Sequence, residues 1–248
     1  MKLLGIIGGI APESTIEYYR AIVAAYRRRR PGRGYPQLVI DSIDLDRLLA
    51  LVGAGELEDL TAWLSDELAR LERAGAQIAL LASNTPHIVF DELRRRSPIP
   101  LISIVETAAD EAAALGMKRV GLFGARFTMR SAVYPAVFSR SGIEVLVPRE
   151  ADLDLIHEKY MAELVEGVFL PETREALLAV VERMRRESKI DGVVLGGTEL
   201  PLLLRGAESP VPLLDTARIH AERAVSEMLN DETPSDRSRS DSSGASCS

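Results

Sequence analysis

The sequence predicts an α/β protein built from two similar parallel-sheet lobes, related by pseudo-twofold symmetry, with the functional cleft between them. Two observations support this prediction. Short apolar runs rich in Leu, Ile and Val alternate with longer amphipathic stretches, which is the pattern of parallel strands joined by crossover helices. The two halves of the chain also repeat one arrangement, a strand that ends in a glycine-containing loop and a later strand that ends in small polar residues.

Eight apolar runs are predicted to be strands, and helices fill the intervals between them. The helix expected over 56–74 carries Trp63 among regularly spaced leucines, which indicates a core position and not a ligand contact. The predicted strands are 3–7, 37–42, 77–82, 100–104, 119–123, 143–147, 192–196 and 211–214.

The repeated features are spaced almost equally in the two halves of the chain. Gly8 precedes Ser83 by 75 residues, and Gly124 precedes Gly197 by 73 residues. This agreement is typical of an ancient duplication of one α/β unit.

The duplication suggests a division of the chain into two lobes and a tail. We expect residues 1–103 and 211–230 to form the first lobe and residues 104–210 to form the second. Residues 231–248 lose their apolar side chains and are predicted to be a disordered tail.

Composition and charge exclude several classes of function. The 248-residue chain is 46% hydrophobic and 27% charged, as expected of a globular protein with a sizeable core. Its net charge of -7 and pI near 5.2 provide no basic face for nucleic acid or an anionic membrane. The apolar start MKLLGIIGGIAP is too short for a membrane span and lacks a signal-peptide cleavage site, and the only cysteine is Cys247. We therefore expect a cytoplasmic protein without disulfides.

No metal and no organic cofactor is expected. The three histidines at 87, 157 and 220 lack metal-ligand spacing. The glycines of IIGGIAP lack the spacing and the acidic partner of a dinucleotide-binding loop. All four lysines lie outside the strand-end loops, where a pyridoxal phosphate would need one.

Polar residues follow the repeated strands at 83–85 and 197–199. Because ligands of open parallel sheets bind beyond the carboxyl ends of the strands, two facing lobes would place these loops on opposite sides of one small molecule. That geometry suits a reaction in which one loop removes a proton and the other returns it from the opposite face.

These motifs resemble the aspartate/glutamate racemase superfamily, a cofactor-independent group, and within it most resemble the branch of amino-acid racemases specific for L-aspartate and L-glutamate. The resemblance covers about residues 3–229. It is carried by the order and spacing of GGIAPEST at 8–15, SNTPH at 83–87, GARFTM at 124–129, GGTEL at 196–200 and LDTARIHA at 214–221.

The chain departs from the family pattern at the two positions that matter most for proton transfer. The resemblance implies C-N-T in the first loop and G-C-T-E in the second, with the two cysteines acting as paired acid and base. Here these positions are Ser83 and Gly197. An alcohol is not appreciably ionised near neutral pH and glycine has no side chain, so a two-thiol relay is excluded.

The binding residues are largely retained. Hydroxyls, an amide and helix N–H groups at strand-to-helix junctions can hold a carboxylate, although the same residue types also serve as ordinary caps and turns. The resemblance implies that Arg126 and Thr128 belong to a loop that closes over the substrate, where Arg126 could pair with a second carboxylate. The substrate-binding set implied in this way is Gly9, Ile10, Asn84, Thr85, Arg126, Thr128 and Thr198.

Four residues are candidates for the chemical step. Ser83 could orient a water or donate a proton, and Gly197 could leave space for that water or for a larger substrate. His87 titrates near neutral pH but could equally support the loop, and Glu199 could equally complement a helix start.

Three functions are left open by the sequence. The first is a diverged lyase, decarboxylase or isomerase that acts on a small amino acid or dicarboxylate through a carbanion. The second is a noncatalytic or regulatory binder of such a carboxylate. The third is an amino-acid racemase that uses Ser83 with water, or His87. A homodimer is expected, because relatives are commonly dimers.

Overall fold

The computed structural model describes residues 1–230 and contains two four-stranded parallel sheets. The predicted tail at 231–248 lies outside the described residues. The first sheet has the order β2-β1-β3-β4, formed by β1 (Leu4–Gly8), β2 (Leu38–Ser42), β3 (Ile78–Leu81) and β4 (Leu101–Ile102). The second has the order β6-β5-β7-β8, formed by β5 (Arg119–Phe123), β6 (Glu144–Leu146), β7 (Gly192–Leu195) and β8 (Leu213–Asp215).

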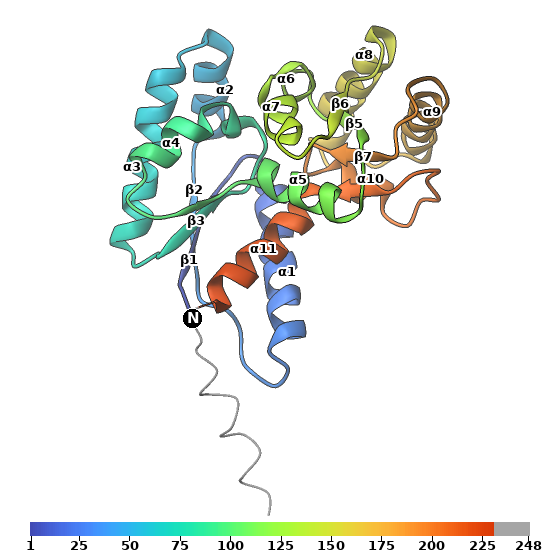
Figure 1. Ribbon diagram of the computed structural model, residues 1–248. Coiled ribbons are helices and arrows are strands. Elements are labelled where there is room, and N and C mark those ends of the chain that lie inside the picture. The colour runs from blue at the N-terminus through green and yellow to red at the C-terminus, as the bar shows by residue number, and fades with distance from the viewer. Residues whose placement is uncertain (231–248) are drawn as a thin grey trace, which may run out of the picture.

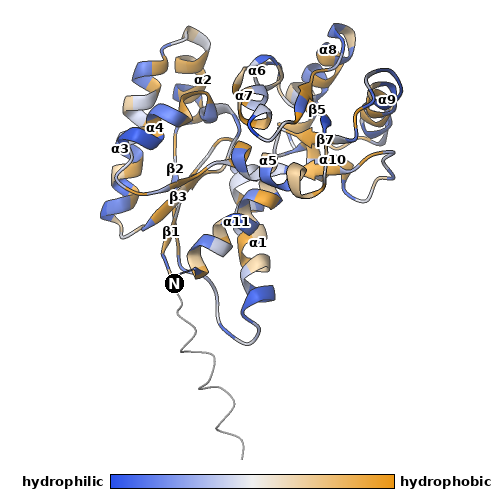
Figure 2. Ribbon diagram, in the orientation of Figure 1, coloured by the Kyte–Doolittle hydropathy of each residue, from blue (hydrophilic) through white to orange (hydrophobic). Residues whose placement is uncertain are grey.

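The two sheets repeat the same strand order, so the predicted α/β class with two similar lobes is confirmed. Each of the eight predicted runs overlaps an observed strand. The central strands β1, β3 and β7, and β5 after its first residue Arg119, are continuous apolar runs because helices cover both of their faces (Figures 1 and 2).

Helices connect the strands and cover the sheets on their outer sides (Figure 1). The first lobe has α2, α3 and α4 on its outer side, and the second has α8 and α9. The helical elements are α1 (Pro12–Arg29), α2 (Leu45–Ala54), α3 (Leu57–Arg73), the 3₁₀ turn η1 (Thr85–Val89), α4 (Phe90–Arg96), α5 (Ile104–Ala114), α6 (Arg126–Arg130), α7 (Val133–Ser139), α8 (Glu150–Lys159), the π-helical turn η2 (Tyr160–Leu164), α9 (Pro171–Ser188), α10 (Leu200–Leu204) and α11 (Thr216–Leu229).

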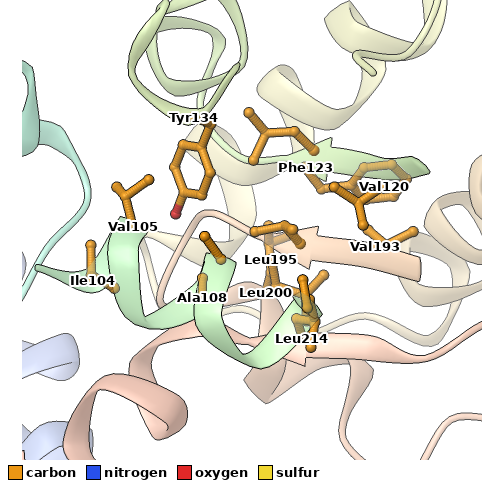
Figure 3. Close-up of a cluster of buried hydrophobic side chains, with 14 of the residues drawn as sticks. Ile104, Val105, Ala108, Val120, Phe123, Tyr134, Val193, Leu195, Leu200 and Leu214 are labelled. Atoms are coloured by element: carbon orange, nitrogen blue, oxygen red, sulfur yellow. The ribbon is translucent and has the colours of Figure 1, made fainter. Parts of the chain in front are cut away.

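Two buried clusters hold the lobes together and fill them. The larger cluster runs from the first sheet through α1, α5 and α11 into the second sheet. Figure 3 shows a part of it, where Tyr134 of α7 lies beside Val105 of α5 and the strand residues Phe123 and Leu195. The smaller cluster lies between the first sheet and α2 to α4, and it contains Trp63, which is buried as predicted.

One boundary of the expected lobes needs correction. The strand β8 pairs with β7, with Val193 opposite Leu213, and therefore belongs to the second sheet and not to the first lobe. Within residues 211–230, only α11 returns to the first lobe, where it packs against α1. It also packs against α5 (Figure 1). Among the described residues, no helix is both long enough and apolar enough to span a membrane.

Candidate functional site

A cavity of about 230 Å³ lies at the carboxyl ends of the central strands of both sheets. Its polar wall comes from the loop after β3, Ser83 to Thr85, and the loop after β7, Gly196 to Glu199. Ile10 follows β1, and Thr128 follows β5. The cavity is thus located where parallel sheets bind their ligands, and it takes residues from both lobes. A larger hollow of about 490 Å³ lies instead among α3, α4, α5 and α7, away from the two loops.

Asn84 presents a free amide donor at this cavity. Its side chain is only 9% exposed, and the Tyr134 hydroxyl donates a hydrogen bond of 2.6 Å to its Oδ1 atom. This bond fixes the orientation of the amide. The Nδ2 donor is buried and has no partner in the described part of the chain. A buried donor without a partner is costly, which makes the Asn84 amide a candidate contact for an acceptor of a ligand.

His87 lies behind this loop and does not line the cavity. Its Nδ1–H donates to the Ser83 carbonyl oxygen at 3.0 Å, and its Nε2 accepts the Ile104 N–H at 3.2 Å. The ring also stacks on Phe90, with centroids 4.7 Å apart. Burial, with a smaller contribution from His220, lowers the pKa of His87 to about 3. The neutral ring therefore holds the loop, and both of its nitrogens are already bonded.

The second loop presents a buried carboxylate. Glu199 is 3% exposed and lines the cavity. The Tyr160 hydroxyl donates to its Oε2 atom, and the Thr198 hydroxyl donates to the same oxygen at 3.0 Å. Burial, and then the neighbouring Glu199 charge, raise the pKa of Tyr160 well above its usual value. Tyr160 is therefore a neutral hydroxyl that shares its proton with a carboxylate.

Tyr160 also corrects the expectation that Gly197 leaves open space. A Cβ atom built on Gly197 would lie 2.5 Å from Cε2 and 2.9 Å from the hydroxyl oxygen of Tyr160. The phenol ring therefore occupies the volume that a side chain at 197 would need. The volume at position 197, where the resemblance places the second cysteine, is therefore filled by Tyr160, which lies at the junction of α8 and η2.

The remaining predicted residues divide between the cavity and its surroundings. Ile10, Thr85 and Thr128 line the cavity. Gly9 does not, but its φ of 85° requires glycine there, and an added Cβ atom would lie 2.6 Å from the Ile43 carbonyl oxygen. The Arg126 side chain is not part of the lining, and it pairs with Asp154 at 2.7 Å.

Sequence reasoning missed Tyr160 and an apolar set of lining residues. Tyr160 lies 37 positions before Gly197 in an ordinary helical stretch, and only the folded chain brings the two together. The missed apolar residues are Leu45, Leu49, Val52, Phe127, Met161 and Val165.

Within the described residues, no group of three His, Cys, Asp or Glu side chains is arranged to hold a metal ion.

Two α/β lobes with a small cavity between their strand-end loops are the architecture expected of a protein that binds a small ligand between its lobes. The model of the Asp/Glu/hydantoin racemase family matches residues 7–224, and the chain belongs to that family. It is 24% identical to the broad specificity amino-acid racemase RacX of Bacillus subtilis over 92% of this chain and 98% of that protein.

Solved structures agree with this assignment over the same length. A candidate Asp/Glu racemase from Yersinia pestis is 30% identical, with a TM-score of 0.86 over 92% of this chain and all of that chain. An aspartate racemase homologue from Pyrococcus horikoshii is 33% identical, with a TM-score of 0.82 over 92% of this chain and 99% of that chain.

Proposed function

We propose that this protein is a cofactor-independent enzyme that holds the carboxylate of a small amino acid or dicarboxylate between its lobes and stabilises a carbanion or enediolate. The reaction we favour is that of a lyase, decarboxylase or isomerase. The observation that carries the proposal is the Asn84 amide: Asn84 lines the cavity, and its buried Nδ2 donor has no partner among the described residues. With the Thr85 hydroxyl, it supplies donors for developing negative charge, whereas the Thr198 hydroxyl already donates to Glu199.

Ordinary two-sided racemisation fits this cavity less well. Ser83 lies on the first-lobe side, and the nearby imidazole of His87 contacts its carbonyl oxygen and not its hydroxyl. An alcohol without an adjacent base is a poor proton acceptor at neutral pH. We therefore assign no proton transfer to Ser83 or His87.

The second-lobe side offers a complete proton path. Tyr160 Oη can take a proton from the substrate carbon while its own hydroxyl proton passes to Glu199 Oε2, and the negative charge moves from the carboxylate to the substrate. In a decarboxylation, a proton taken up from solvent by Glu199 would pass through Tyr160 Oη to the carbanion left by carbon dioxide, which returns Glu199 to the carboxylate. Their existing hydrogen bond supports this role.

The lost thiols also favour a second candidate, a noncatalytic carboxylate binder. The enzyme, racemase and binder hypotheses are separated by NMR of the protein incubated in deuterated water with amino-acid and malonate probes. Release of carbon dioxide or loss of substrate supports the proposed reactions. Deuterium at Cα of both enantiomers supports racemisation and contradicts the one-sided path. Calorimetric binding without any turnover supports the binder.

The carboxylate site itself is tested by Asn84→Asp, which keeps the acceptor for Tyr134 but replaces the free donor by a negative oxygen. We expect carboxylate affinity to fall by about tenfold or more, the loss of one charge-assisted hydrogen bond. The exposed Asn230→Asp variant introduces the same charge away from the cavity and is the matched control. Equal affinity of Asn84→Asp and the control would contradict the assignment.

A further inference from the structure

A second part of the cavity lining is apolar. It comes from α2, from α6 and from the turn η2 with the residue after it, and it consists of Leu45, Leu49, Val52, Phe127, Met161 and Val165. Three of these side chains are exposed, Leu49 by 49%, Met161 by 44% and Phe127 by 38%. Single exposed hydrophobic residues are common, but three that line one cavity form an apolar surface for a ligand.

No lining residue in the described part of the chain is a lysine or an arginine. Arg126, next to the lining residue Phe127, pairs with Asp154 at 2.7 Å and is 44% exposed. The lining imidazole of His157 has a lowered pKa, chiefly through burial and then through Arg126, and its Nδ1 accepts the Arg126 N–H at 3.3 Å. His157 is therefore neutral at pH 7.

A carboxylate in the side chain of the substrate would meet unfavourable surroundings at the apolar wall. It would leave water for an apolar wall without a cationic partner, which is costly for a charged group. It would also share a cavity of about 230 Å³ with the carboxylate of Glu199. An uncharged aliphatic side group would instead gain by burial against the same wall.

We propose that the substrate carries one recognised carboxylate at the polar loops and an apolar side group against the α2 and η2 wall, and not an acidic side chain. This inference rests on the proposed function and narrows its substrate class. It also departs from the expectation that Arg126 pairs with a second carboxylate.

Calorimetry with matched probes tests the inference. Leucine is compared with aspartate in both enantiomers, and isobutylmalonate with carboxymethylmalonate, so that each pair differs only in an apolar or acidic side group. We expect the apolar member to bind about tenfold more tightly or better. Tighter binding of the acidic members would overturn the inference and leave the carboxylate site intact. Absence of binding by every probe would overturn both this inference and the proposed function.

A charge placed in the wall gives an independent test. Leu49→Arg supplies the missing cation at a half-exposed lining position and is expected to shift the preference by about tenfold toward the acidic probes. Leu115→Arg is the matched control, because Leu115 is 54% exposed at the end of α5 and lies outside the cavity lining. An equal preference in the two variants would overturn the placement of the side group against this wall.

Discussion

Replacing Gly197 by alanine tests whether Tyr160 fills the place of the missing side chain. The new Cβ would lie 2.5 Å from Cε2 of Tyr160, whereas carbon atoms in contact are about 3.5 to 4.0 Å apart. The ring must therefore move by about 1 Å or more. Overpacking of this kind costs about 1 to 3 kcal/mol, and displacement of the ring also weakens its hydrogen bond to Glu199.

The backbone does not contribute to this cost. Gly197 does not adopt a left-handed conformation, so alanine is permitted there by its φ angle. At a site with free space, the same substitution stabilises a protein by about 0.4 to 1 kcal/mol through the unfolded chain. Gly53 in α2 is such a site, since no atom lies within 4 Å of its added Cβ. Gly197→Ala and Gly53→Ala are therefore expected to have opposite signs.

Urea unfolding at neutral pH measures both effects. In a Tyr160→Ala background the ring is absent, and Gly197→Ala should lose its cost. The double-mutant cycle between positions 160 and 197 should give a coupling free energy of about 1 to 3 kcal/mol. An equal effect of Gly197→Ala in the two backgrounds would refute the conclusion that the phenol occupies this volume.

Two further predictions concern the histidines and the lost thiols. Burial lowers the pKa of His220 to about 4 and that of His87 to about 3. Because the unfolded chain takes up these protons near pH 6.5, stability is complete above that pH and falls as the pH decreases toward 4. His220 accounts for about 3 kcal/mol, and urea unfolding of His220→Gln should show a weaker pH dependence than wild type, whereas an unchanged slope would contradict this. The pair Ser83→Cys and Gly197→Cys should stay inactive as a racemase until Tyr160→Ala is added, as followed by loss of optical rotation of an amino acid that binds. Racemase activity of the Ser83→Cys and Gly197→Cys double variant without Tyr160→Ala would contradict this prediction, because it would show that the Tyr160 ring moves aside for a side chain at position 197.

The strands and their loops could be predicted because their signals are local. A buried parallel strand is a continuous apolar run, and the small polar residues that follow β3 and β7 mark the ligand end of the sheet without any tertiary information. The repeat between the halves then predicted two similar lobes. These inferences required only the order of residues along the chain.

The contacts between distant segments could not be predicted in this way. Tyr160 reaches Glu199 across 39 positions, and nothing in the sequence around η2 distinguishes this tyrosine from a core residue. Arg126 follows the expected loop, but the choice between a ligand and Asp154 depends on how α8 packs against α6. The strand β8 was assigned to the wrong lobe because an apolar run does not specify which sheet it joins.

The two sides of the cavity differ in chemistry although the lobes repeat one topology. The first-lobe side offers a neutral amide donor from Asn84 and the hydroxyl of Ser83. The second-lobe side offers Glu199, a carboxylate that accepts hydrogen bonds from Tyr160 and Thr198. Under the proposed function, a ligand between them exchanges a proton with the second-lobe side only, because the first-lobe side lacks a base. The proposed function therefore expects a single stereospecific proton transfer, and a chiral product formed in deuterated water should carry deuterium in one configuration only.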